Sequence, residues 1–204
     1  MVVNSEAGSR RRQPKGDKRD RTRAKLLEAA RSLIREKGHE QATLEEIAAR
    51  AGMTTGAIYG NFKNREELFI SLGQTYWAPI KPQVKPGSSF SAIMRAIAEA
   101  TIAAIPDRSA AAVGRLTGLA YTLAHEEMRV RVREITAQSY AFGEQWLRAV
   151  TKEEELPMPA DQLVRVLHAM IEGLVFQRLL TPELVPDEIF RAAFGALATR
   201  ANKE

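Results

Sequence analysis

The residues from Thr54 to Phe62 combine small and polar side chains in a way that suits contact with DNA. Thr55 is short enough to hydrogen-bond a base edge or a phosphate, and Tyr59 is long enough to reach a phosphate oxygen. Ala57 can contact the methyl group of a thymine, and Gly56 lets the backbone approach a duplex closely. The run therefore predicts the recognition helix of a DNA-binding unit.

Three further residues within or next to this run bear on the predicted site. Lys63 lies just before the start of the following helix, where a cation and unpaired backbone amides together bind phosphate. Asn61 either reads the edge of an adenine or caps the end of the helix. Gly60 is a second glycine after Gly56, and each costs a helix about 1 kcal/mol relative to Ala unless close approach or packing compensates.

Short helices must position these residues. From Thr22 onward, apolar residues recur every three or four positions, which predicts a first helix that ends at Gly38. Thr43 and Glu46 form the pattern of a capping box, which predicts a second helix that ends near Ala51.

A tight turn separates the second helix from the third. Gly52 can adopt the positive φ that the turn needs, and Thr54 is placed to cap the third helix, which we expect to end near Phe62. Asn64 and Glu67 predict the cap of a fourth helix. Two short helices joined by a glycine turn make a helix-turn-helix, which places its second helix in the DNA major groove, although many helical hairpins never touch DNA.

After a linker at residues 80–88, the rest of the chain shows helical patterns and no competing strand pattern. We expect helices at residues 89–105, 108–124, 126–150, 160–180 and 187–201. One face of residues 126–150 is apolar throughout, which predicts that it packs inside a helical body. The residues of this face are Met128, Val132, Ile135, Ser139, Phe142, Trp146 and Ala149.

The excess of positive charge lies in the N-terminal third of the chain. Residues 1–70 hold 15 Lys and Arg against 10 Asp and Glu, whereas residues 71–204 hold 15 of each. We expect residues 1–20 to form a disordered basic arm. Such an arm suits a partner that carries phosphates, although a solvated tail has the same composition.

The composition also excludes several classes of protein. The chain has 204 residues and no cysteine, which removes disulfides and cysteine-ligated zinc and is compatible with a reducing compartment. No apolar run approaches the roughly 20 residues of a membrane-spanning helix, and no secretory signal pattern is present. We therefore expect a cytoplasmic protein that does not enter a membrane.

A wider set of residues resembles the N-terminal domain of the TetR family of transcriptional regulators. The matching positions are Ala29-Ala30, Gly38, Thr43-Leu44, Ile47-Ala48, Ala51-Gly52-Met53, Gly56-Ala57-Ile58-Tyr59, Asn61-Phe62 and Glu67-Leu68. A weaker match, Met170 to Leu174, resembles the start of the dimer-forming penultimate helix of that family. Two departures affect the expected base preference: Arg65 stands where the family often has Lys, and Gly60-Asn61 replaces a frequently bulky or histidine pair.

The resemblance implies an all-α fold, with an N-terminal three-helix helix-turn-helix domain at residues 21–65 and a C-terminal helical ligand-binding and dimerisation domain at residues 66–204. It implies a homodimeric repressor that binds a near-palindromic operator in double-stranded DNA and is released by a small-molecule effector, without a cofactor. By position, five residues match places that in this family commonly touch phosphate or bases: Thr43, Thr54, Thr55, Tyr59 and Lys63. Gly56, Ala57 and Asn61 complete the predicted DNA-binding site.

Two further sets of residues are candidates for the effector site and the dimer interface. The polar and aromatic residues in the middle of the body are the candidates for the effector site, although any one of them alone fits an ordinary core position. They are Tyr121, His125, Tyr140, Phe142, Trp146 and His168. The apolar faces of the last two helices are the candidates for the dimer interface: Leu163, Met170, Gly173, Leu174, Ile189, Phe194 and Leu197.

Two other functions compete with a regulator. A helical small-molecule-binding enzyme is disfavoured because the three histidines are scattered and no HExxH, P-loop or GxGxxG pattern occurs. A protein that binds nucleic acid or anionic surfaces without sequence preference would share the basic arm. Discrimination between DNA sequences would separate it from a regulator.

Overall fold

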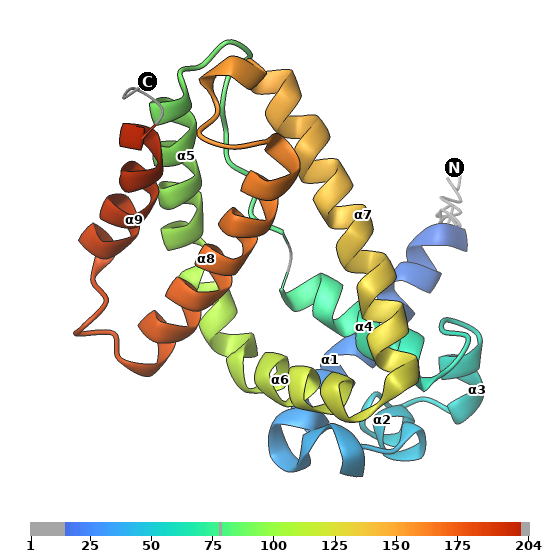
Figure 1. Cartoon of the computed structure of the whole chain (residues 1–204). Helices are drawn as coiled ribbons and strands as arrows, with labels where there is room; N and C mark the ends of the chain where they lie inside the picture. Colours follow the sequence, from blue (N-terminus) through green and yellow to red (C-terminus); the bar gives the residue numbers. More distant parts are fainter. Residues whose placement is uncertain (1–14, 78, 201–204) are drawn as a thin grey trace, which may run out of the picture. The chain divides into compact units, whose positions relative to one another are not determined.

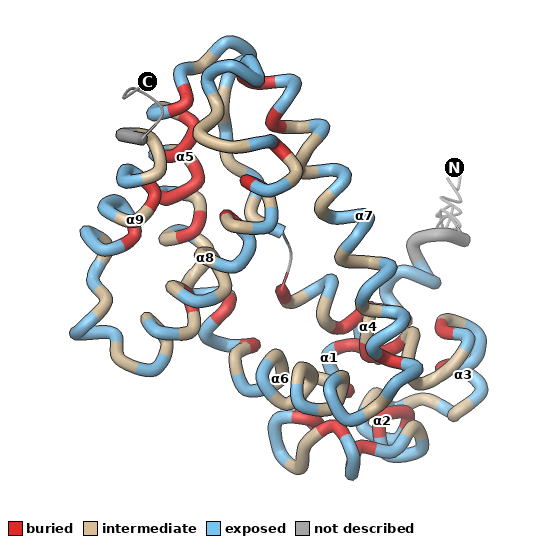
Figure 2. The backbone as a smooth tube through the Cα atoms, viewed as in Figure 1, coloured by how far each residue is buried: buried red, intermediate tan, exposed pale blue. Residues whose placement is uncertain are grey.

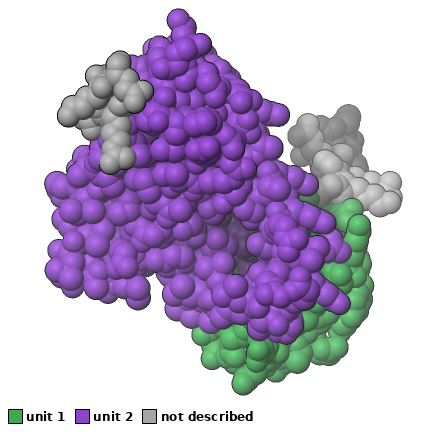
Figure 3. Space-filling model, viewed as in Figure 1, with its two compact units in different colours: residues 1–68 green, residues 69–204 purple. Residues whose placement is uncertain are grey.

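The structure is a computed structural model that describes residues 15–77 and 79–200. The regular elements among these residues are all helical, so the predicted all-α fold is confirmed (Figure 1). The chain divides into two compact units, which Figure 3 colours separately: unit 1 ends at Leu68 and unit 2 begins at Phe69. None of the described helices is long and apolar enough to cross a membrane.

Unit 1 is built from α1 (Lys15–Gln41), α2 (Leu44–Arg50), α3 (Thr55–Tyr59) and the beginning of α4 (Arg65–Tyr76). Helix α1 begins before the expected Thr22 and includes residues 15–20, which were expected to lie in the arm. Lys and Arg are good helix formers, and exposed positions such as Lys18 and Arg19 keep their charges in water. Residues 1–14 of the predicted arm lie outside the described residues.

Local signals set the ends of these helices. The backbone leaves helical geometry at Gly38, where φ is 81°, as predicted. The capping box of Thr43 and Glu46 is present, and Gly52 has the expected positive φ of 67°. Helix α3 ends at Tyr59 rather than near Phe62, because Gly60 serves as its C-cap.

The core of unit 1 joins α1 to the two short helices. Leu26, Ala30 and Ile34 of α1 are almost wholly buried, as are Ile47 of α2 and Ile58 of α3. Burying a branched aliphatic side chain contributes about 1.5–3 kcal/mol, so these few contacts are sufficient to hold helices too short to be stable alone. The core therefore fixes the face that α3 turns to solvent.

Unit 2 contains α5 (Phe90–Ala103), α6 (Ile105–Ala124), α7 (Glu126–Val150), the 3₁₀ turn η1 (Glu153–Glu155), α8 (Ala160–Leu180) and α9 (Asp187–Arg200). These bounds follow the predicted ranges closely. Helix α5 packs along α9, and α8 packs against both α6 and α7 (Figure 1). The core lies where α5, α8 and α9 meet, around Ile93, Met94, Leu163, Phe190 and Phe194.

The apolar face predicted for α7 is not buried as a whole. Met128 is buried, but Phe142 is 69% exposed and Trp146 is half-buried (Figure 2 shows the burial along the helix). The buried residues near the C-terminal end of α7 are Leu147 and Val150 instead. The expectation that this face packs inside the body is therefore wrong for the single chain, because Ser139, Phe142 and Ala149 of the face are exposed.

Candidate nucleic-acid interface and the second unit

Helix α3 is anchored on one side and exposed on the other. Ile58 is fully buried and Phe62, just beyond the helix, is almost so. Tyr59, next to Ile58, is 60% exposed. Among the other predicted DNA-binding residues, Thr43, Thr54, Gly56 and Lys63 are exposed and Thr55, Ala57 and Asn61 are half-buried. The predicted residues of α3 thus lie around one exposed side of a helix whose other side is fixed by packing.

The hydroxyl of Thr43 is engaged at the start of α2. It donates a hydrogen bond of 2.8 Å to the Glu46 carboxylate and accepts one of 3.3 Å from the Glu46 amide. Lys37 pairs with the same carboxylate, and the bonds from Lys37 and then Thr43 lower the pKa of Glu46 to about 2. Thr43 therefore positions α2, whatever contact it also makes with a phosphate. Thr54 occupies the N-cap of α3, but its side chain makes no capping hydrogen bond, so that predicted cap is wrong.

Asn61 closes the C-terminal end of α3. Its Nδ2 donates to the Ala57 carbonyl at 2.7 Å, and its own backbone carbonyl accepts from Arg23 Nη1 at 2.8 Å. The Oδ1 atom is buried. Reading an adenine requires both ends of the side-chain amide, so this geometry favours the capping alternative. Arg23, which also lies 4.2 Å above the Phe62 ring, gave no signal in the sequence because its partners are far along the chain.

The start of α4 has its own cap. The Glu67 amide donates to Asn64 Oδ1 at 2.9 Å, which confirms the predicted cap, and the Lys63 amide donates to the Glu67 carboxylate at 2.7 Å. Two amides of the expected phosphate site are therefore already bonded, and a carboxylate lies beside them. A phosphate would have to be held by the exposed ammonium of Lys63 rather than by these amides.

Arg65 joins the start of α4 to the loop between α1 and α2. Its guanidinium donates to the carbonyls of His39, Glu40 and Ala42. A planar group with several fixed donors can serve adjacent carbonyls in a way that an ammonium cannot. The departure from the usual family residue therefore has a structural role in this chain.

In unit 2, four of the six predicted effector residues lie in two separate ring pairs. Tyr121 stacks on His125 with ring centroids 3.9 Å apart, and the His125 Nδ1 lies 2.8 Å from the Tyr121 carbonyl. Tyr140 meets His168 edge-on at 5.4 Å. Phe142 is exposed and Trp146 is half-buried, as described above.

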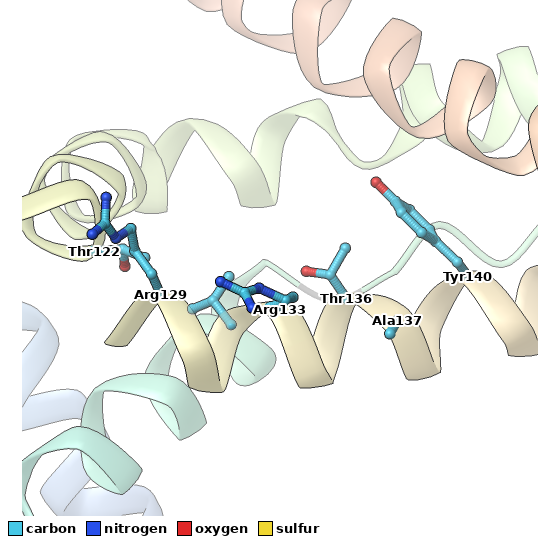
Figure 4. Close-up of a pocket in the computed structure, with 7 residues that line it drawn as sticks. Thr122, Arg129, Arg133, Thr136, Ala137 and Tyr140 are labelled. Carbon is cyan, nitrogen blue, oxygen red and sulfur yellow. The ribbon is translucent and has the colours of Figure 1, made fainter. Parts of the chain in front are cut away.

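A groove of about 350 Å³ runs along α7 (Figure 4). Its lining residues are Thr122, Arg129, Val132, Arg133, Thr136, Ala137 and Tyr140. Tyr140 alone among the predicted effector residues is part of this lining. The expectation that all six form one cavity wall is not supported for this groove, because aromatic character alone did not indicate which side of each helix faces it.

A largely buried group of charged residues in unit 2 was not predicted from the sequence. The Glu172 carboxylate accepts hydrogen bonds from Trp77 Nε1 at 2.7 Å and from Arg115 Nη2 at 3.1 Å, and it pairs with Arg108 at 3.5 Å. These four residues, here called the Arg108 cluster, come from α6, α8 and the residue after α4. The spacing of Arg108 and Arg115, two helical turns apart, was an available signal that they share a face.

The residues predicted for the dimer interface differ in how far they are buried. Leu163 and Phe194 are fully buried in the core of unit 2, so they are unavailable to a partner and that prediction is wrong for them. The apolar stripe of α9 packs on α5 of its own chain. Met170, Leu174 and Leu197 are half-buried, whereas Gly173 and Ile189 are exposed.

Comparisons with known proteins agree with this architecture. The family model described as "Bacterial regulatory proteins, tetR family" matches residues 26–72. The HTH-type transcriptional regulator SrpR of Pseudomonas putida is 24% identical over 181 residues, which cover 87% of this chain and 84% of SrpR. The HTH-type transcriptional repressor BepR of Brucella suis is 45% identical over 51 residues, 25% of this chain and 24% of BepR.

A solved structure extends the likeness to the fold of the chain. NalD of Pseudomonas aeruginosa, the secondary repressor of the MexAB-OprM multidrug efflux pump, matches with a TM-score of 0.58 at 24% identity and covers 89% of this chain and 95% of NalD. The matched family segment contains the helix-turn-helix of unit 1, and these relatives are regulators of transcription rather than enzymes. Residues 26–72 therefore match the DNA-binding domain of bacterial regulatory proteins of the tetR family, and most of the chain shares its fold with NalD.

Proposed function

We propose that this chain is a repressor that binds a near-palindromic operator as a homodimer and is released by a small-molecule effector. The observation that carries the proposal is the fixed exposure of Tyr59: its neighbour Ile58 is fully buried, while Tyr59 itself is 60% exposed on the recognition helix. A side chain held in this way contacts DNA without a large entropy cost on binding.

The chemistry of the exposed side of α3 supports contact with DNA. Tyr59 and Lys63 supply a hydroxyl and an ammonium for phosphates, while Thr55 and Ala57 are small enough for base edges in the major groove. In a homodimer, two such helices about 34 Å apart would meet successive major grooves on one side of the duplex. The expected operator is therefore two similar half-sites in inverted order.

The relatives support repression. BepR is named a transcriptional repressor, and NalD is described as the secondary repressor of a multidrug efflux pump. In a repressor of this kind, the effector binds more tightly to a conformation that fits DNA poorly. A coupling free energy of about 1–3 kcal/mol would lower operator affinity roughly 5- to 150-fold.

In vitro selection from random duplex DNA tests the proposal. The wild-type protein should enrich an inverted repeat, and the Tyr59→Ala/Lys63→Ala double variant should lose it. Lys152→Ala, an exposed lysine of unit 2, is the matched control and should enrich the same repeat as wild type. Enrichment of no sequence by the wild-type protein would favour the competing function, binding to nucleic acid without sequence preference.

A further inference from the structure

The Arg108 cluster holds more positive than negative charge in a largely buried place. Two guanidinium groups, those of Arg108 and Arg115, share the single carboxylate of Glu172. Arg108 is only 4% exposed, and its guanidinium lies 4.7 Å from the centre of the Trp77 ring. The ring faces and the ion pairs stabilise the cations, but the group as a whole carries a surplus of one positive charge.

This surplus has an energetic consequence. A buried charge is costly unless a group of opposite charge compensates it. Burial lowers the pKa of Arg108, Glu172 opposes that shift, and the neighbouring charge of Arg115 adds to it. A bound anion would remove the imbalance, whereas a bound cation would increase it.

Glu172 itself is unsuited to a cationic ligand. Its carboxylate already accepts from Trp77 and Arg115 and pairs with Arg108. A ligand cation would have to replace at least one of these partners and would then lie beside two guanidinium groups. The excess charge of this cluster is therefore positive and comes from its two arginines.

Arg115 is the accessible member of the pair. About 29% of its side-chain surface is exposed, compared with 5% for Arg108. Its Nε is buried and has no hydrogen-bond partner among the described residues. The bond to Glu172 uses only one of the guanidinium's N–H groups, so an anion that approaches the exposed part of Arg115 would meet a guanidinium with donor capacity left.

The groove along α7 is connected to this cluster through His168, which contacts Tyr140 and on which the charges of the cluster act. At one end of the groove the Tyr140 hydroxyl lies 3.5 Å from the His168 Nδ1, and His168 precedes Glu172 by one turn of α8. Figure 4 shows Thr136 and Tyr140 extending from the same side of α7. The groove also includes Arg129 and Arg133, of which Arg129 is paired with Glu126. The surface that lines the groove is mainly apolar, and its lining residues include no carboxylate.

We propose that the effector is an organic monocarboxylate whose carboxylate binds Arg115 and Arg108 beside Glu172 and whose remaining atoms extend into the α7 groove. A single negative charge matches the surplus of one, and the planar fork of a guanidinium suits a carboxylate. This inference rests on the proposed function only in supposing that the chain has an effector.

Pairs of probes that differ only in charge test the proposal. Benzoate and octanoate are compared with benzamide and octanamide, and binding to the full-length protein without DNA is measured by calorimetry and thermal shift. Each acid should bind at least about tenfold more tightly than its amide, roughly the effect of one charge-assisted hydrogen bond. Equal binding, or no binding, of both members of both pairs would overturn the proposal.

Substitutions test whether Arg115 supplies the charge that binds the acids. Arg115→Gln should abolish the preference for the acid, and Arg115→Lys should restore part of it. Glu172→Gln raises the surplus to two and should strengthen binding of the acids. Arg131→Gln, an exposed arginine of α7 outside the groove, is the matched control and should leave the preference unchanged.

Folding and function are checked separately. Circular dichroism of each variant shows whether it is folded, and a preference for the acid that persists in folded Arg115→Gln would place the site elsewhere and overturn the proposal. Operator selection with the ligand-free protein is independent of these probes. An operator without any acid preference would refute the monocarboxylate alone, whereas an acid preference without an operator would refute the repressor.

Discussion

At the scale of single residues, the exposed side of α3 and the residues that hold it have different roles. Tyr59 and Lys63 present polar atoms to solvent, whereas Asn61 and Thr43 use theirs to close the ends of helices. In the sequence, a polar side chain that caps a helix cannot be told from one that contacts DNA, because capping and DNA contact favour the same residue types. Only the hydrogen-bond partners distinguish them.

Lys63 should contribute charge rather than base preference. Lys63→Ala should weaken binding to all DNA sequences by a similar factor and reduce the slope of log K against log salt concentration by about 1, since one phosphate contact is lost. Fluorescence anisotropy at several salt concentrations measures this slope. Lys152→Ala should leave it unchanged, and a change of preferred sequence in Lys63→Ala would contradict the assignment.

The carboxylate of Glu46 should make the free energy of unfolding depend on pH in the acidic range. Its pKa falls from an ordinary 4.5 to about 2 in the folded chain. Because the folded-state pKa is the lower one, the contribution is fully present above about pH 4.5 and is lost as the pH falls through 2.

Urea denaturation at a series of pH values tests this dependence. The free energy of unfolding should fall more steeply between pH 4.5 and 2 in wild type than in Glu46→Gln. Glu45→Gln, which removes a neighbouring exposed carboxylate outside the capping box, should retain the steep fall. Parallel curves for wild type and Glu46→Gln would show that the capping box has no such effect.

At the scale of helices, the predicted bounds were accurate where local chemistry decides them. Gly38 and Gly52 adopt positive φ, and the Thr43–Glu46 and Asn64–Glu67 caps form as expected. Each of these signals involves residues no more than a few positions apart. Helix α3 was predicted too long because the apolar spacing continues to Phe62, although the helix itself ends at Tyr59.

The Arg108 cluster was harder to predict, because its residues come together only through tertiary packing. Trp77, Arg115 and Glu172 belong to distant parts of the sequence. Each of them alone is a residue type that occurs commonly at surface or core positions. The same dependence on tertiary packing explains why some residues predicted for the dimer interface are buried within the single chain. An apolar stripe shows that a helix face is covered, but Phe194 is covered by its own chain.

Two glycines should respond in opposite ways to substitution by alanine. Gly38→Ala places a side chain at a φ of 81° and should destabilise the protein by about 1–2 kcal/mol. Gly73→Ala lies within α4, where a Cβ would meet no atom within 4 Å, and should stabilise by up to about 1 kcal/mol. Urea denaturation compares the two, and changes of equal sign would refute this account.

At the scale of the whole molecule, three exposed apolar residues between the end of α8 and the start of α9 are candidates for a surface of self-association. Leu180, Leu184 and Ile189 are 68%, 69% and 43% exposed. Apolar side chains gathered in this way commonly mark interfaces. We expect Ile189→Glu to shift the proposed homodimer toward monomer, because a charge would be buried in an interface formed by these residues.

Sedimentation velocity at several protein concentrations measures this shift. Leu123→Glu, which introduces the same charge at another exposed apolar position, should leave the dimer intact. If Ile189→Glu associates as tightly as wild type, Ile189 lies outside the interface.

The pairing of α5 with α9 has a consequence for the order in which the chain folds during synthesis. The helices of unit 1 adjoin one another in the sequence, so unit 1 can fold soon after it leaves the ribosome. Helix α5 must wait for α9, to which the Arg191–Glu99 ion pair at 2.7 Å also joins it. At roughly 5–20 residues per second, the apolar face of α5 would stay uncovered for several seconds, an interval in which a nascent chain is open to chaperones and to aggregation.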